Sequence, residues 1–258
     1  MHGLVNLPIV PVRLYASETS ELTSQLLYGE LIEIIETDEL WYFVSNQTDQ
    51  YSGWVDRKMI KIIDDIEFNS INSAKPIIIS NPFMEYFESE TSAKYYLPAG
   101  SALHKHNKGS FVLNSKKIDL QSYYLEDLYG LNSQHLIYIA KQFLNAPYLW
   151  GGKSILGIDC SGLVQLSFYI CGMKLPRDAS HQLIFGVQVD FLTDAKAGDL
   201  AFFENAQGQI SHVGILINNH QIIHASGWVK IENIDAYGII SSISGEYTHT
   251  LSVIKRYF

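Results

Sequence analysis

Cysteine is scarce in this sequence, and so are charged residues. The 258 residues include two cysteines, Cys160 and Cys171, and 17% of them are Asp, Glu, Lys or Arg. If one helix carries both cysteines, a rise of about 1.5 Å per residue separates them by roughly 16 Å. A disulfide needs Cα atoms within about 7 Å of each other. We therefore expect no disulfide, which favours a reducing compartment.

Long apolar runs are also missing. No window approaches the roughly 18 uncharged apolar residues of a transmembrane helix, so no membrane span is expected. The start of the chain, MHGLVNLPIVPVRLYAS, lacks a basic region, and Pro8 and Pro11 interrupt its apolar residues, which is not the pattern of a signal peptide. A cytoplasmic protein is the expectation, with a periplasmic or secreted one as the alternative if a leader has been removed. The net charge of −9 argues against nucleic acid or an anionic membrane as a partner.

Two β-rich segments are expected ahead of residue 131. Residues 1–64 contain short strand-like runs separated by Gly and by polar turns. These runs include LIEIIE (31–36), LWYFVS (40–45) and YSGWVD (51–56). Residues 65–130 show further runs punctuated by Pro and Gly. Each segment predicts a small all-β barrel.

From residue 131 the pattern becomes a helix followed by strands. HLIYIAKQFLN (135–145) carries apolar residues at helical spacing. After a second, cysteine-bearing helix come the strand-like runs DLAFF (199–203), HVGILI (212–217), QIIHAS (221–226) and LSVIKRYF (251–258). Helices first and a sheet afterwards is an α+β layout.

The segment PYLWGGKSILGIDCSG leads into an apolar run that ends at Cys171-Gly172. This pattern predicts a helix with Asp159 as its N-cap and Gly172 at its C-terminal stop. Cys160 then lies in the first turn, where the helix dipole is expected to lower the thiol pKa below its ordinary value of about 8.5. Cys171, inside the apolar run, is expected to be a core cysteine.

Two downstream histidines are spaced to meet. A hairpin turn near Asn218 would place His212 and His224 opposite each other, with Cβ atoms about 4.5–5.5 Å apart. A cysteine with a histidine base that a third group orients is the arrangement of nucleophilic catalysis. The other histidines, His249 among them, are expected to be surface or structural residues. The sequence has no CxxC, no HExxH and no similar ligand spacing, so we expect no metal and no cofactor.

The motifs PYLWGG, DCSGLVQ, LPRDASHQ, GDLAFF, HVGI and IIHAS occur in this order within residues 131–258. On these motifs, that part resembles the NlpC-type cell-wall cysteine peptidases, a papain-like family that cuts murein peptides. Residues 1–64 resemble bacterial SH3-type domains, and residues 65–130 a second, degenerate one. Together they look like the γ-D-glutamyl-L-diamino acid endopeptidase branch, also called dipeptidyl-peptidase VI. The resemblance implies an α+β papain-like catalytic domain preceded by two small all-β SH3-type barrels.

The resemblance also implies roles for individual residues. Cys160 would be the nucleophile, His212 the general base and His224 its orienting partner. Tyr148 would stabilise the oxyanion together with the backbone N–H of Cys160. The expected substrate-binding residues are Tyr51, Trp150, Asp159, Ser161 and Asp178.

Asp178 matches by position the carboxylate that would bind the free amine of the substrate. Arg177 could pair with Asp178 or with a substrate carboxylate, and the sequence leaves that choice open. It likewise leaves open whether Glu18 or Glu21 supplies a second contact to the amine.

The implied reaction is hydrolysis of the amide between γ-D-Glu and a diamino acid, meso-diaminopimelate or L-Lys, in murein peptides with a free N-terminal L-Ala. Such a reaction suits the recycling of cell-wall peptides. The alternatives are an exported hydrolase of intact peptidoglycan stems and a non-catalytic murein-binding module. An intact set of Cys160, His212 and His224 argues against the binding module.

Overall fold

The computed structural model describes residues 1–87, 94–104, 110–113, 116–119 and 131–258. The chain forms two compact units. The first comprises Met1–Asp127 together with Trp150–Ile155, and the second Leu128–Leu149 together with Leu156–Phe258. Trp150–Ile155 therefore belongs to the first unit, although both of its sequence neighbours belong to the second. Among the described residues, no helix has the length and apolar character that crossing a membrane requires.

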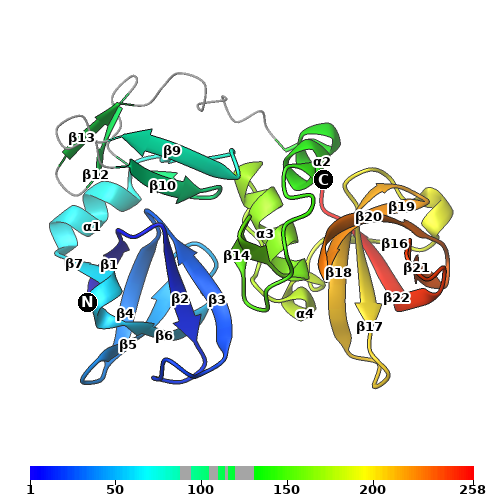
Figure 1. The fold of residues 1–258 in the computed structure, drawn as a ribbon, viewed down its shortest axis with the longest axis horizontal. Helices are drawn as coiled ribbons and strands as arrows, with labels where there is room; N and C mark the ends of the chain where they lie inside the picture. Colours follow the sequence, from blue (N-terminus) through cyan, green and yellow to red (C-terminus); the bar gives the residue numbers. More distant parts are fainter. Residues whose placement is uncertain (88–93, 105–109, 114–115, 120–130) are drawn as a thin grey trace. The chain divides into compact units, whose positions relative to one another are not determined.

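A seven-stranded antiparallel sheet forms the body of the first unit (Figure 1, blue to cyan). In the order β3-β2-β6-β5-β4-β1-β7, its strands are β1 (His2–Val5), β2 (Ile9–Arg13), β3 (Leu22–Leu27), β4 (Leu31–Thr37), β5 (Trp41–Asn46), β6 (Ser52–Asp56) and β7 (Ile60–Ile63); the short helix η1 (Arg57–Met59) precedes β7. Alternate residues of the strands, such as Val10 and Val12, point into one apolar core. The three strands expected between residues 31 and 56 are confirmed as β4, β5 and β6.

The second barrel expected over residues 65–130 is wrong for the part of that segment that the structure describes. The helix α1 (Asp65–Asn72) begins it, because the Asp64 side chain accepts a hydrogen bond from the N–H of Glu67 and so caps a helix. Among its described residues, the strands that follow pair two by two: β8 (Ile77–Ile78) with β11 (Ala102–Leu103), β9 (Phe83–Phe87) with β10 (Lys94–Pro98), and β12 (Ser110–Leu113) with β13 (Lys116–Asp119). Proline has no N–H for a ladder, and Pro98 ends β10.

The second unit begins with helices and continues as a sheet, which confirms the expected α+β layout. Its helices are α2 (Ser133–Lys141), α3 (Cys160–Ile170), α4 (Ala179–Gln182) and the short η3 (Leu192–Asp194). The sheet, in the order β16-β22-β17-β18-β19-β20-β21, contains β16 (Val187–Val189), β17 (Leu200–Glu204), β18 (Ile210–Asn218), β19 (Gln221–Ser226), β20 (Trp228–Ile234), β21 (Gly238–Ile240) and β22 (Tyr247–Arg256). The two-residue strand β15 (Gly157–Ile158) precedes α3 in this unit, whereas the equally short β14 (Lys153–Ser154) lies in the segment that belongs to the first unit.

The long strand β22 closes this sheet on itself. One part of β22 pairs with β17 and another part pairs with β21, so that β17 to β22 form a ring (Figure 1). Apolar side chains from these strands, including Phe203, Leu216 and Ile254, share one core. Closure brings residues of β22 and β18 together although they are far apart in sequence.

Helix α3 forms as its sequence predicts. The carboxylate of Asp159 accepts a hydrogen bond of 2.7 Å from the N–H of Gly162, which caps the first turn. Gly172 ends the helix with a φ of +91°, a conformation that glycine adopts without a steric penalty. Nearly every residue between them is buried, which is typical of an apolar helix inside a domain. The cap therefore fixes Cys160 at the first position of a buried helix.

Candidate active site

Cys160 is the first residue of α3, and 6% of its surface is exposed. The backbone N–H groups of Ser161 and Val213 donate hydrogen bonds to its sulfur. Val213 directly follows His212 in β18. The N-terminus of α3 therefore lies against β18 at the position of His212.

The pKa of the Cys160 thiol is higher than the sequence led us to expect. Burial raises its pKa to about 12, and the neighbouring Asp159 carboxylate acts in the same direction. The N–H groups of Val213 and Ser161 and the charge of Arg177 oppose this shift but do not overcome it. The lowered pKa expected from the helix dipole is therefore wrong, because desolvation of the thiolate outweighs the dipole. A base has to take the proton as the sulfur attacks.

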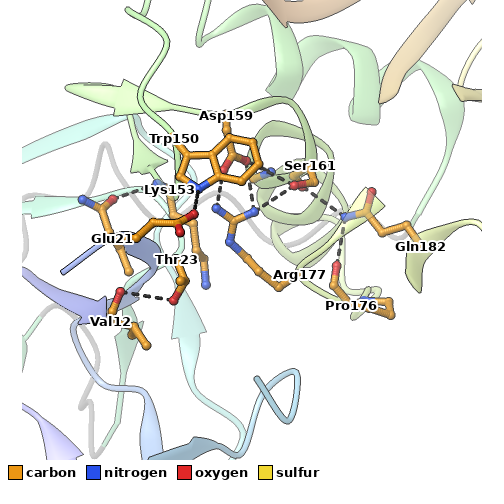
Figure 2. Close-up of polar contacts among 12 residues, drawn as sticks. Val12, Glu21, Thr23, Trp150, Lys153, Asp159, Ser161, Pro176, Arg177 and Gln182 are labelled. Carbon is orange, nitrogen blue, oxygen red and sulfur yellow. Dashed lines mark hydrogen bonds and ion pairs between the residues drawn. The ribbon is translucent and has the colours of Figure 1, made fainter. Parts of the chain in front are cut away.

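Arg177 stabilises the helix start from its polar side (Figure 2). It donates to Oδ1 of Asp159 at 3.0 Å, to Oδ2 of Asp159 at 2.5 Å and to Oγ of Ser161 at 2.8 Å. Both charged side chains are buried. The sequence left the partner of Arg177 open, and the structure pairs it with Asp159. Asp159 is buried and already accepts hydrogen bonds from Arg177, Ser161 and the N–H of Gly162, and its expected role in substrate binding stays a prediction.

His212, His224 and Glu232 form a chain of hydrogen bonds on three neighbouring strands. Nε2 of His212 lies 2.9 Å from Nδ1 of His224, and Nε2 of His224 lies 3.0 Å from Oε2 of Glu232. The side chains of His224 and Glu232 are completely buried. The predicted contact between the two histidines is confirmed, whereas sequence reasoning missed Glu232.

The two histidines meet diagonally and not face to face. The register pairs Ile215 with Ile223, and a bulge between Leu216 and Asn218 separates this part from the turn. If the register of Ile215 and Ile223 is continued by one residue, Gly214 lies opposite His224. The direct pairing expected between His212 and His224 is therefore wrong. A Cβ at Gly214 would lie 3.0 Å from the His224 Cβ. The missing side chain leaves room for His224 to reach His212, two residues away on the same face.

His249 of β22 belongs to the same cluster, contrary to the expectation that it has no part in it. Its ring stacks on that of His212 with centroids 4.1 Å apart. Burial, together with His249 and His224, lowers the pKa of His212 well below its ordinary value. Burial also lowers the pKa of His224, although Glu232 opposes this, and it lowers the pKa of His249 to about 4. His212 is therefore neutral near pH 7 and can accept a proton.

Three histidines are candidate metal ligands within the part of the chain that the structure describes. Nitrogen atoms of His212, His224 and His249 lie within 4.8 Å of one another. Neutral imidazoles are good ligands for zinc. However, both nitrogens of His224 are already hydrogen-bonded, to His212 and to Glu232. A metal at this place would have to replace the bond between His212 and His224.

Tyr148 lies near the thiol in the second unit. Its N–H donates to the carbonyl of Gly227 at 2.9 Å, which fixes its backbone. Burial raises the pKa of the Tyr148 phenol far above its ordinary value, and the charges of Cys160 and Asp159 add to this. The phenol therefore keeps its proton and can donate a hydrogen bond to an oxyanion.

Asp178 stands at the start of the short helix α4. Its side chain does not cap this helix, is 43% exposed and lies 3.7 Å from Nδ1 of His181. Unlike the buried Asp159, Asp178 is thus accessible to an ammonium group. Its role in substrate binding stays a prediction, as does that of Ser161.

Tyr51 and Trp150 belong to the first unit. The indole Nε1 of Trp150 donates to Oε1 of Glu21 at 2.6 Å (Figure 2), while Glu18 lies in an exposed turn. The contact engages Glu21 with a neighbour in its own unit. The expected roles of Tyr51 and Trp150 in substrate binding stay predictions.

Lys153 fixes the segment Trp150–Ile155 to the first unit. Its N–H donates to Oε1 of Gln25 at 2.7 Å, and its Nζ lies 3.7 Å from Oε1 of Glu30. Both charged side chains of this pair are buried. Burial raises the pKa of Glu30, whereas Lys153 and a hydrogen bond from Asn46 act in the opposite direction.

Comparison with known proteins agrees with this geometry. Residues 145–253 match the NlpC/P60 family, and residues 14–60 match the bacterial dipeptidyl-peptidase SH3 domain. A γ-D-glutamyl-L-lysine dipeptidyl-peptidase of Bacillus subtilis is 28% identical over 252 residues, covering 92% of this chain and 81% of the relative. A protein of the same name from Bacillus cereus is 25% identical over 266 residues, covering 90% of this chain and 77% of the relative.

A solved structure has the same fold. The crystal structure of an NlpC/P60 family protein from Bacillus cereus superposes with a TM-score of 0.83 at 20% identity, covering 100% of this chain and 99% of that one. One SH3 domain is matched in this chain, not two. The chain is thus a peptidase with an NlpC/P60 domain, preceded by a bacterial dipeptidyl-peptidase SH3 domain.

Proposed function

We propose that this peptidase hydrolyses the bond between γ-D-Glu and the diamino acid in murein peptides with a free N-terminal L-Ala. The observation that carries the proposal is the buried Cys160 beside the hydrogen-bonded pair of His212 and His224. Relatives named γ-D-glutamyl-L-lysine dipeptidyl-peptidase align with most of the chain and so support this substrate class. Such a reaction would serve the recycling of released murein peptides, for which we propose a cytoplasmic location.

In the proposed mechanism, His212 takes the thiol proton while the sulfur of Cys160 attacks the carbonyl carbon. The phenol of Tyr148 and the N–H of Cys160 donate to the oxyanion. The imidazolium of His212 then gives its proton to the leaving amine of the diamino acid. Water, deprotonated by His212, hydrolyses the thioester and releases L-Ala-γ-D-Glu.

The neutral state of both groups fits this sequence of steps. The raised pKa of Cys160 and the lowered pKa of His212 favour a resting pair of thiol and imidazole. Proton transfer and attack then occur together, without a stored thiolate. The bond between His212 and His224 holds the base in place throughout the reaction.

Asp178 is proposed to bind the substrate ammonium. Removing the carboxylate would leave the substrate ammonium without its charged partner. Because the Asp178 side chain is 43% exposed, solvent screens this pair, and we expect a smaller loss of kcat/KM than the roughly 3–5 kcal/mol of a buried pair would give. The loss caused by Asp178→Asn and the loss caused by acetylating the amine should not add, because both changes remove the same interaction between the carboxylate and the ammonium.

The test compares L-Ala-γ-D-Glu-meso-diaminopimelate, the corresponding L-Lys tripeptide and their N-acetylated forms. We expect wild type to cleave the free tripeptides, and acetylation and Asp178→Asn to cause similar losses of kcat/KM. Asp190→Asn, which removes an exposed carboxylate of the same unit, is the matched control. Wild-type activity that is indifferent to acetylation would refute the recycling function and favour an exported hydrolase of intact stems.

A further inference from the structure

We infer that Glu232 is a positioning residue that sets which nitrogen of His224 carries the proton and, through His224, which nitrogen of His212 is basic. The inference rests on the proposed function only in taking His212 as the base. Glu232 lies on β20 and contacts His224. It therefore acts on the reaction through another side chain.

A pair of neutral histidines has an ambiguity that a histidine paired with a carboxylate lacks. Each neutral imidazole has one N–H donor and one acceptor nitrogen. The 2.9 Å bond between His212 and His224 could therefore run in either direction. If Nδ1 of His224 donates, His212 accepts at Nε2 and carries its own proton on Nδ1. That nitrogen then cannot take a second proton from the thiol.

Glu232 removes this ambiguity. An ionised carboxylate only accepts hydrogen bonds, so Nε2 of His224 has to donate to Oε2 of Glu232. Nδ1 of His224 is then the acceptor, and Nε2 of His212 has to donate to it. The remaining nitrogen of His212, Nδ1, is left with a free lone pair for the proton. The negative charge of Glu232 thus sets the direction of the hydrogen bond from His224 to Glu232 and of the one from His212 to His224.

The surroundings of Glu232 keep it ionised despite its burial. Oε1 accepts from the N–H of Ser242 at 2.8 Å and from its hydroxyl at 3.0 Å, and Nζ of Lys230 lies 3.3 Å away. Burial alone would raise the pKa of Glu232, but the bonds from His224 and Ser242 together lower it to about 2. One oxygen is thus used by Ser242 and Lys230, and the other is left for His224.

Strand register explains why Glu232 reaches His224. The ladder between β19 and β20 pairs His224 with Lys230 and Ile222 with Glu232. Glu232 is therefore two residues along from the position opposite His224 and shares its face of the sheet. His224 lies between His212 and Glu232 and can contact both. This geometry argues for transmission through His224.

The first experiment measures kcat and KM of Glu232→Gln. A glutamine has the size of glutamate but can donate as well as accept, so it no longer dictates the proton on His224. We expect kcat to fall by about 10–100-fold, the usual effect of losing such an outer hydrogen-bond partner, with KM within about twofold of wild type.

Asp199→Asn is the matched control. Asp199 is another buried carboxylate of the same unit, and its oxygens accept hydrogen bonds from Arg256 and from the N–H of Lys196. Its loss should leave kcat of the folded enzyme within about twofold of wild type. An equal fall of kcat in both variants would show a merely structural effect and overturn the inference.

The second experiment observes the proton positions directly by ¹⁵N NMR of histidine-labelled protein near pH 7. We expect both His212 and His224 to carry the proton on Nε2 in wild type and to show a mixture of tautomers in Glu232→Gln. Unchanged tautomers in the variant would overturn the inference, even if kcat falls. This readout needs no substrate, so it stands even if the tripeptide proves not to be cleaved.

A double variant protects the test against misfolding. In His224→Ala alone, the buried carboxylate of Glu232 loses its histidine partner. Adding Glu232→Gln removes that charge. If Glu232 acts only through His224, the double variant should be within about twofold of His224→Ala in its rate of Cys160 alkylation by iodoacetamide. A further large loss in the double variant would show that Glu232 acts by another route.

Discussion

Replacing Arg177 with methionine would test how the helix of the nucleophile is held. In the structure the guanidinium bridges Asp159, the N-cap of α3, and the hydroxyl of Ser161. Arg177 is 2% exposed and Asp159 5%. Methionine fills much of the same space without charge, so Arg177→Met leaves the Asp159 carboxylate buried without its cation.

The expected loss of stability follows from these contacts. Breaking a buried ion pair by removing one partner costs about 3–5 kcal/mol. The hydrogen bond from Gly162 to Asp159 remains in the variant and keeps a capping contribution of about 1 kcal/mol. In Asp159→Asn/Arg177→Met no charge is left behind, and asparagine caps a helix as well as aspartate. We therefore expect the double variant to be more stable than Arg177→Met.

Amide hydrogen exchange followed by mass spectrometry measures this effect where it occurs. The chain has two compact units, so a single global unfolding curve would not isolate α3. The opening free energy of α3 peptides should fall by about 3–5 kcal/mol in Arg177→Met. Lys174→Met, which removes an exposed cation nearby, should change it by less than about 0.5 kcal/mol. The reasoning is refuted if Arg177→Met matches this control, or if the double variant is the less stable one.

Four further predictions concern the cluster around the thiol. Cys160→Ala should abolish hydrolysis and Cys171→Ala should retain most of it; equal loss in two folded variants would contradict the assignment. Because burial raises the pKa of Cys160 to about 12, its alkylation by iodoacetamide should be slow at pH 6 and accelerate towards pH 10, and rapid labelling at pH 6 would reveal a stored thiolate. His212→Ala should lower kcat by about 10²–10⁴-fold and His224→Gln far less, since an amide can also orient the base; the division of roles fails if both lose equally. Gly214→Ala should lower kcat more than it changes KM, because its Cβ would lie 2.7 Å from Cδ1 of Ile222 and 3.0 Å from the Cβ of His224; unchanged kinetics would show that neither contact displaces His224.

Local signals in the sequence were sufficient for the helix of the nucleophile. The Asp159 cap, the apolar run and the terminal Gly172 act within a dozen residues, and the structure contains the predicted helix. The contact between His212 and His224 was also predictable, because one hairpin joins their strands. Both features depend on neighbours in sequence.

The features that were missed depend on tertiary pairing. Glu232 reaches His224 through the register of β19 and β20, and His249 reaches His212 because β22 closes the sheet into a ring. The bulge after Leu216 changes which residue faces His224 and has no clear sequence signal. The acidity of Cys160 depends on how deeply α3 is buried, which the helix pattern alone does not show.

The pairing of Lys153 with Glu30 has a consequence for the order of events during synthesis. Glu30 is made before its buried cation, Lys153, which is made only after the first helix of the second unit. At about 5–20 residues per second, the growing chain spends several seconds with this carboxylate lacking its ionic partner. The first unit, though N-terminal, can therefore reach its final packing only after Ile155 has left the ribosome. The SH3 domain then reaches its final packing at nearly the same time as the nucleophile Cys160, a few residues further on, leaves the ribosome.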